Sequence, residues 1–163
     1  MTPRRPQGLA GDTRAPLAST HTATGFPDRS EPQGAVWTAR YQNKRIPASG
    51  LVAVRITAGY PRFRLRYELA ATVRELAPIW TMFGLADDEF TRRYRERLET
   101  VGVDRIRTIL DGIRQSAGAD PVLLCFEDLT KAPCHRRMFA DWWTEQTGEP
   151  VLELEEEVVA IEP

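Results

Sequence analysis

The residues best suited to chemistry stand side by side at Cys134–Arg137, where a thiol, an imidazole and two guanidinium groups follow one another. They come shortly after Val122–Phe126, an apolar run typical of a buried strand, and they open a segment with helical spacing that ends at Gly148. Where a strand leads through a short loop into a helix, the loop and the first helical turn lie at the carboxyl end of the sheet, where open α/β sheets bind ligands. The positive end of the helix dipole favours anions there. The sequence therefore predicts a site at Cys134–Arg137.

The thiol of Cys134 has three possible roles. Its place in the first helical turn, beside His135 and Arg136, predicts a lowered thiol pKa and a nucleophile, with His135 and Glu127 as acid–base partners. It could instead be a small residue packed at a helix start, or one metal ligand in a set with Cys125, Glu127 and His135. The C-x8-C-H spacing matches no common structural zinc pattern, and adjacent Cys and His rarely face one ion. The predicted catalytic residues are Cys134, His135 and Glu127, with no metal and no cofactor.

Basic residues predict an anionic ligand. Residues 35–66 contain seven basic residues and no acidic one, whereas the chain from Glu145 onward contains seven glutamates and no base. Within the basic segment, the loop at 58–65 places two arginines around Phe63, a pattern that suits stacking on a ring and contact with phosphate. Consecutive helical positions lie about 100° apart, so we expect Arg136 to face the site and Arg137 to face an acid or solvent. The predicted ligand-binding residues are Arg136, Arg62, Arg64, Tyr60 and Arg40.

Length and composition limit the possible classes of protein. The chain has 163 residues, of which 42% are apolar, and this suits one folded domain. The net charge of −1 gives no general reason to expect a membrane or nucleic acid as partner, and no apolar run is long enough to span a membrane. The two cysteines are too few for a disulfide scaffold. These features predict a reduced, cytoplasmic protein that does not bind membranes.

The order of elements along the chain predicts an α/β fold. Strand patterns occur at 35–42, 51–57, 122–126 and 150–155, and helical patterns at 67–77, from Asp87 or Asp88 to Gly102, and from Asp104 to Gly118. We expect Trp80 and Phe83 to pack against the core, and one of Trp142 and Trp143 to be buried while the other lies near the rim. Residues 1–34 are predicted to be a disordered tail, 35–155 a single domain and 156–163 an acidic tail.

These motifs resemble the domain-of-unknown-function 488 family, from Val36 to about Leu154. The most specific part is LLCFED at Leu123–Asp128 followed by CHRR at Cys134–Arg137, and WTARYQNK and RITAGYPRFRLRYELAATVRELAPIW support it. The chain is most similar to the actinobacterial-type branch, which implies a bacterial protein. The resemblance also implies a three-layer α/β sandwich with a small, mostly parallel sheet flanked by helices. It implies no reaction, because the family is named for its unknown function.

Three functions remain possible from the sequence. The first is an enzyme for a phosphate-bearing substrate, such as a nucleotide or a nucleic-acid base, with chemistry at Cys134 or His135. The second is a non-catalytic module that recognises a nucleotide or nucleic acid with the same arginines. The third is a structural or regulatory subunit in which CHRR forms a buried cluster.

Removal of residues 1–34 should leave the melting temperature of the protein nearly unchanged, because this segment holds too few large apolar residues to offset its ordering entropy. Differential scanning calorimetry of the full and shortened chains checks this. A fall of more than a few degrees would show that the segment packs on the domain.

Overall fold

The computed structural model describes residues 34–129 and 133–156. The predicted tails lie outside these residues, apart from Gly34 at the start and Glu156 at the end.

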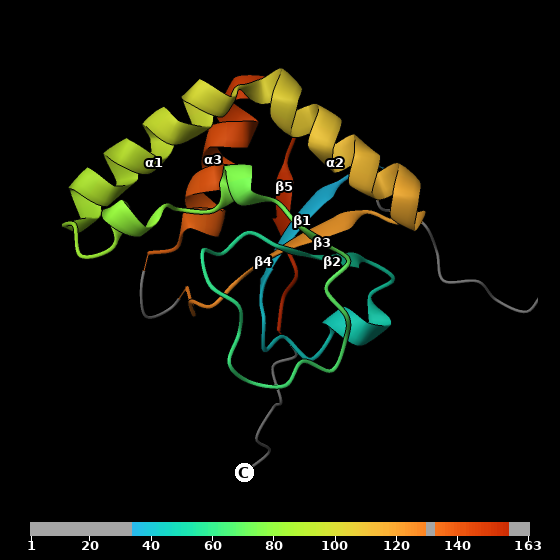
Figure 1. Ribbon diagram of the computed structural model, residues 1–163. Coiled ribbons are helices and arrows are strands. Elements are labelled where there is room, and N and C mark those ends of the chain that lie inside the picture. Colours follow the sequence, from blue (N-terminus) through green and yellow to red (C-terminus); the bar gives the residue numbers. More distant parts are fainter. Residues whose placement is uncertain (1–33, 130–132, 157–163) are drawn as a thin grey trace, which may run out of the picture. The chain divides into compact units, whose positions relative to one another are not determined.

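A five-stranded sheet with strand order β3-β2-β4-β1-β5 forms the centre of the domain (Figure 1). All four strand pairings are parallel, and this confirms the predicted α/β fold. In register, Arg40 of β1 pairs with Cys125 of β4, and Arg55 of β2 pairs with Leu124 of β4, so the three central strands end together. The strands are β1 (Val36–Arg40), β2 (Val52–Arg55), β3 (Ala71–Thr72), β4 (Pro121–Cys125) and β5 (Val151–Glu153).

Three α-helices and three short 3-10 turns lie between the strands of the described segments. Helices α1 and α2 meet at Gly102, whose φ of 81° is accessible to glycine at little cost and lets the chain turn sharply between them. No helix in residues 34–129 and 133–156 combines the length and the apolar character needed to cross a membrane. The elements are α1 (Asp87–Val101), α2 (Val103–Ala117), α3 (His135–Thr147), η1 (Ile46–Ala48), η2 (Arg74–Leu76) and η3 (Trp80–Met82).

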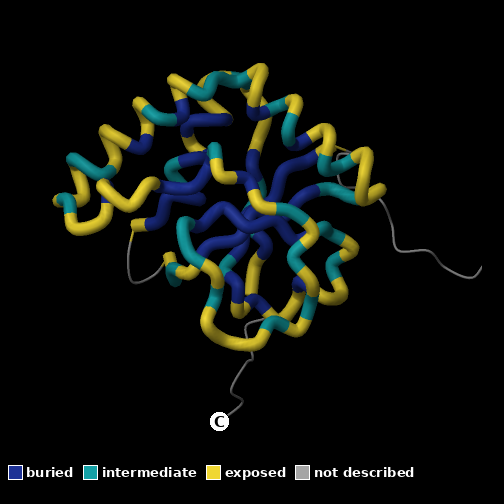
Figure 2. The backbone as a smooth tube through the Cα atoms, viewed as in Figure 1, coloured by how far each residue is buried: buried dark blue, intermediate teal, exposed yellow. Residues whose placement is uncertain are grey.

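The two faces of the sheet are covered by different kinds of structure. All three α-helices contribute to the core on one face, against inward residues such as Val54 and Leu123. The other face is covered by Ile46 of η1 and by the extended segment 65–69, which pack on Ala53 and Leu124. The three central strands β2, β4 and β1 are therefore largely buried, and Figure 2 shows buried backbone at the centre of the domain.

The predicted helix at 67–77 is wrong. Backbone N–H groups of Ala70 and Val73 donate to the carbonyls of Ala53 and Arg55 on β2, so the chain forms strand β3 and then the turn η2. The segment before it alternates between partly buried Leu65, Tyr67 and Leu69 and exposed neighbours. That period of two is typical of an extended chain packed on one side. The same alternation of apolar and polar residues is visible in the sequence and could have predicted an extended segment here.

The predicted difference between Trp142 and Trp143 is also wrong, because both indole rings are buried. Helix α3 packs against α1 and α2 as well as β1, β4 and β5, so more than one side of the helix is buried. Trp143 donates from its indole Nε1 to Glu149 at 3.3 Å. Both tryptophans therefore anchor α3.

Replacing either Trp142 or Trp143 with Ala should lower the free energy of unfolding by about 3–5 kcal/mol, because each change empties a large volume in the core. Urea denaturation of the two variants measures the loss. Trp80→Ala is the control, since its ring is exposed and its loss should cost no more than about 0.5 kcal/mol. Losses near the control value for both core variants would show that α3 is peripheral.

Candidate functional site

Four donor side chains meet at the carboxyl end of β4. The ligand atoms of Cys125, Glu127, Cys134 and His135 all lie within 4.8 Å of one another. The two sulfur atoms are 3.0 Å apart, and the Sγ of Cys134 is 3.2 Å from a carboxylate oxygen of Glu127. The Sγ of Cys125 contacts the same oxygen and lies 3.4 Å from Nδ1 of His135. The structure thus brings together the three predicted catalytic residues and Cys125, which was named from the sequence only as a possible metal ligand.

Cys134 and His135 reach the same point because they differ in backbone conformation. Cys134 is the N-cap of α3 with extended φ and ψ of −133° and 137°, whereas His135 is the first helical residue. The rule that adjacent helical residues diverge by about 100° does not apply across this boundary. The expectation that adjacent Cys and His rarely face one point therefore does not hold for this pair.

The imidazole of His135 is held in one orientation. Its Nε2 lies 2.8 Å from the carbonyl oxygen of Ile56, which follows β2. Because a carbonyl only accepts, Nε2 carries a proton, and in the neutral ring Nδ1 presents its lone pair to the two cysteines. Tyr94 packs edge-on against the ring, and its own hydroxyl donates to the carbonyl of Leu76.

The acids of the cluster are shifted in opposite directions. Burial, together with the neighbouring thiol of Cys134, raises the pKa of Cys125 far above its usual value. The hydrogen bond to Cys125 lowers the pKa of Cys134 despite burial, and His135 adds to this effect. Burial would raise the pKa of Glu127, but its contacts with both cysteines outweigh this and lower it. The predicted lowering of the Cys134 pKa is confirmed, although its cause is mainly the second cysteine.

Arg136 lies behind the cluster rather than at a ligand surface. Its side chain is 2% exposed, its NH2 is 3.0 Å from the carboxylate of Glu153 on β5, and its NH1 donates to the carbonyl of Glu127 at 2.6 Å. The expectation that Arg136 contacts a ligand is corrected, because an internal acid and a carbonyl already take its donors. Arg137 pairs with exposed Asp141, as expected for the outward position.

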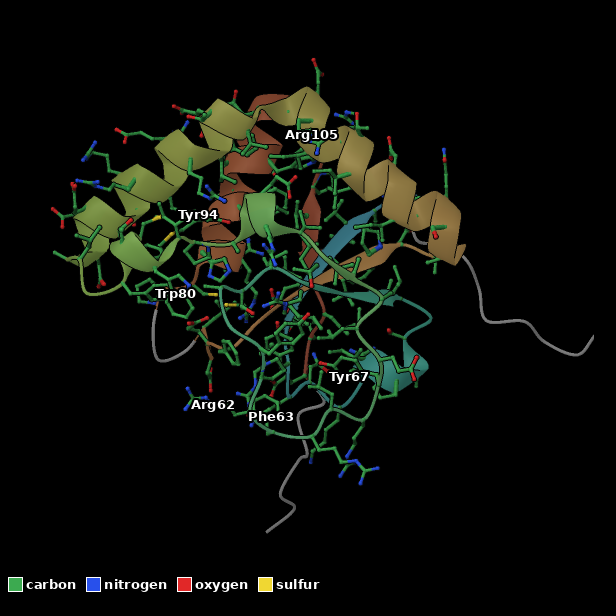
Figure 3. All side chains as sticks on the ribbon, viewed as in Figure 1. Arg62, Phe63, Tyr67, Trp80, Tyr94 and Arg105 are labelled. Carbon is green, nitrogen blue, oxygen red and sulfur yellow. The ribbon has the colours of Figure 1, made fainter. Side chains whose placement is uncertain are left out.

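A pocket of about 530 Å³ opens beside the cluster. Glu127 and His135 line it, together with residues of the loop after β2, of η3 and of α1, whereas Cys125 and Cys134 do not. The loop at 59–63 and the start of α3 therefore share one pocket, as the parallel sheet predicts. Figure 3 labels Arg62, Phe63 and Trp80 among its residues. The aromatic residues that line it are Tyr60, Phe63, Trp80, Phe83, Phe90 and Phe126.

The predicted ligand-binding residues divide into two groups. Tyr60 and Arg62 line the pocket, and the guanidinium of buried Arg55 lies 3.7 Å from the centre of the Tyr60 ring, which holds that ring from behind. Arg64 is exposed but does not line the pocket. Arg40 pairs with Asp128 and Glu156 and also lies outside it, because its position at the end of β1 faces those acids.

Sequence reasoning missed the wall formed by Trp80 and Phe83. Both were expected in the core, but their side chains are 72% and 51% exposed and their ring centres lie 5.3 Å apart. The available signal was their position between Pro78 and Gly84, in a stretch without helical or strand spacing. Large aromatic residues in such a connection are as compatible with a ligand pocket as with a core.

Comparison with known proteins identifies no relative of this chain. No protein-family model matches the chain, and neither the curated proteins nor the solved structures gave a significant match. Membership of the domain-of-unknown-function 488 family therefore stays a prediction.

Replacing Arg136 with Met should lower the free energy of unfolding by about 3 kcal/mol, because Glu153 and the Glu127 carbonyl lose their buried partner. Arg137→Met is the matched control at the next position, and loss of its exposed ion pair should cost less than about 1 kcal/mol. Chemical denaturation of both variants makes the comparison. Equal losses would show that Arg136 has no special structural role.

Proposed function

We propose that this protein binds a nucleotide, or a nucleotide unit of a nucleic acid, in the pocket beside His135. The proposal rests on one observation, the location of the exposed large apolar side chains. Within the described residues, the exposed large hydrophobic side chains are Tyr60, Phe63, Ile79, Trp80, Phe83, Phe126 and Leu129, and all except Ile79 and Leu129 line this pocket. A concentration of this kind marks a binding site.

The shape and chemistry of the pocket favour a flat ring. Aromatic side chains line the pocket from the loop after β2 and from η3, and base rings stack on aromatic side chains. Of the polar side chains that line the pocket, the Glu127 carboxylate can accept hydrogen bonds from a ring N–H or amino group of the ligand. Thr57 also lines the pocket, but its hydroxyl already donates its proton to the carbonyl of Gly59. The volume of about 530 Å³ suits a ligand of nucleotide size.

Arginines at the pocket mouth support a phosphate on the ligand. Arg62 lines the pocket, and Arg64 and Arg66 follow it on the same exposed loop. Within residues 34–129 and 133–156, none of these three arginines forms an ion pair with a carboxylate, in contrast to Arg40 and Arg136. Because the unpaired charges continue beyond the pocket, a nucleic-acid strand is the alternative ligand to a free nucleotide.

Chemistry on such a ligand would take place at His135 and Glu127, which line the pocket. Cys134 is 3% exposed and is separated from the pocket surface, so direct attack by its sulfur on a bound ligand is not supported by the geometry. The contacts of this sulfur are instead with Cys125, Glu127 and Arg136.

Calorimetric titration with the four nucleoside monophosphates, the matching nucleosides and inorganic phosphate tests this function. We expect the monophosphates to bind more tightly than the nucleosides, and phosphate alone to bind weakly. Trp80→Ala should weaken nucleosides and nucleotides alike by about 1–3 kcal/mol, through lost stacking. Arg62→Ala should weaken only the nucleotides, by about 1.5 kcal/mol or more, through the lost charged hydrogen bond.

Arg105→Ala is the control, because this exposed arginine on α2 pairs with Glu75 and does not line the pocket (Figure 3). A short single-stranded oligonucleotide serves as the further ligand, and tighter binding than any monophosphate would favour the nucleic-acid alternative. Absence of binding by all of these ligands, or equal effects of Arg62→Ala on nucleosides and nucleotides, would contradict the proposed function.

A further inference from the structure

The cluster of Cys125, Glu127, Cys134 and His135 has the geometry of a metal centre. Each residue offers one ligand atom, and the four atoms lie within 4.8 Å of one another. Around a tetrahedral zinc ion with Zn–S bonds of about 2.3 Å and Zn–N bonds of about 2.0–2.1 Å, neighbouring ligand atoms lie roughly 3.3–3.8 Å apart. The observed sulfur–nitrogen separation of 3.4 Å lies within this range, whereas the sulfur–sulfur separation of 3.0 Å is shorter and must lengthen when the ion enters.

The four side chains of the cluster offer more hydrogen-bond acceptors than donors. The Glu127 carboxylate only accepts, and Nδ1 of neutral His135 presents a lone pair because Nε2 donates to Ile56. The four side chains themselves then hold at most two weak S–H donors for four acceptor groups, and a further donor near them is NH1 of Arg136, 3.6 Å from the Sγ of Cys134. A cation at the centre satisfies all four lone pairs at once.

We propose that these four side chains form a zinc site. Two thiolates, an imidazole and a carboxylate are the ligand types of tetrahedral zinc sites in proteins, and the two soft sulfur ligands disfavour magnesium and calcium. On binding, Zn²⁺ displaces the thiol protons to solvent, and its two positive charges offset two of the three negative charges then carried by the thiolates and Glu127.

The residues around the ligands form the supporting shell that such a site requires. Ligand histidines usually donate the second ring N–H to a carbonyl or carboxylate, and His135 donates to Ile56 at 2.8 Å. NH1 of Arg136 lies 3.6 Å from the Sγ of Cys134, so it supports a thiolate there. Glu153 fixes that guanidinium in turn, at 3.0 Å.

The zinc site would lie directly behind the nucleotide pocket proposed above, because Glu127 and His135 belong to both. Glu127 is the only half-exposed ligand, so it is the ligand that a water molecule or a bound group can replace. The zinc proposal does not depend on nucleotide binding, and its test contains no nucleotide.

The test measures zinc in the reduced, untagged, full-length chain after dialysis against limiting zinc, by elemental analysis and by competition with a chromogenic chelator. We expect one zinc ion per chain. Cys125→Ser, Cys134→Ser and Glu127→Gln should each weaken zinc affinity by more than the roughly 10–100-fold typical of a lost outer-shell partner. His21→Ala is the control, since it removes the other histidine of the chain and should leave zinc binding unchanged.

A second measurement needs no variant and therefore does not depend on how well the cysteine variants fold. Zinc should slow the reaction of both thiols of the wild-type chain with a disulfide reagent, as counted by mass spectrometry, and a chelator should restore the rate. Cobalt should replace zinc and give the charge-transfer absorption of thiolate ligands together with the visible bands of four-coordinate cobalt.

Three outcomes would overturn the proposal. One is a folded, reduced wild-type chain that binds no zinc and whose thiols zinc does not protect. Another is unchanged affinity in Glu127→Gln, which would remove the carboxylate from the ligand set. The last is a chain whose cluster does not respond to zinc but forms a Cys125–Cys134 disulfide when the protein is oxidised. The 3.0 Å sulfur–sulfur separation would then be that of a redox pair.

Discussion

The site depends on one break in backbone conformation, between extended Cys134 and helical His135. A helix that began one residue earlier would turn the thiol and the imidazole to different sides, and the four-residue cluster would be lost. The break is stabilised from both directions. Cys134 is held by its contacts with Cys125 and Glu127, and His135 is held by the carbonyl of Ile56. Strands β2 and β4 are neighbours in the sheet, so their carboxyl ends present both sets of partners to the same helix start.

Arg136 shows how charge in this fold is used internally. Its side chain links α3 to β5 through Glu153 and to the loop after β4 through the Glu127 carbonyl. A buried cation of this kind is tolerated because an acid and a carbonyl satisfy it. The positive charge beside the pocket comes instead from the loop after β2, where Arg62 borders the pocket. The protein thus separates a structural arginine behind the cluster from exposed arginines in front of it.

The fold class and the location of the site were predictable because they depend on local patterns. The apolar run ending at Cys125 and the helical spacing after Cys134 place a loop at the carboxyl edge of the sheet, and the pocket lies there. The buried partner of Arg136 was not predictable, because it depends on β5 pairing in parallel with β1, far away in sequence. The same holds for Trp80, whose exposure is set by tertiary packing rather than by residue type. The metal set of Cys125, Glu127, Cys134 and His135 was considered from the sequence but disfavoured, because adjacent Cys and His rarely face one ion and the sequence does not reveal the change of backbone conformation after Cys134.

The zinc ion proposed for the four-residue cluster would lie beside the aromatic pocket, because Glu127 and His135 belong to both. X-ray diffraction on either side of the zinc absorption edge, from crystals grown with zinc, tests this zinc site most directly. The account predicts an anomalous peak about 2.3 Å from the sulfur atoms of Cys125 and Cys134 and about 2.0–2.1 Å from Nδ1 of His135, with Glu127 on the pocket side. A map with no peak within bonding distance of both sulfur atoms, or with the two sulfurs joined in a disulfide, would contradict it.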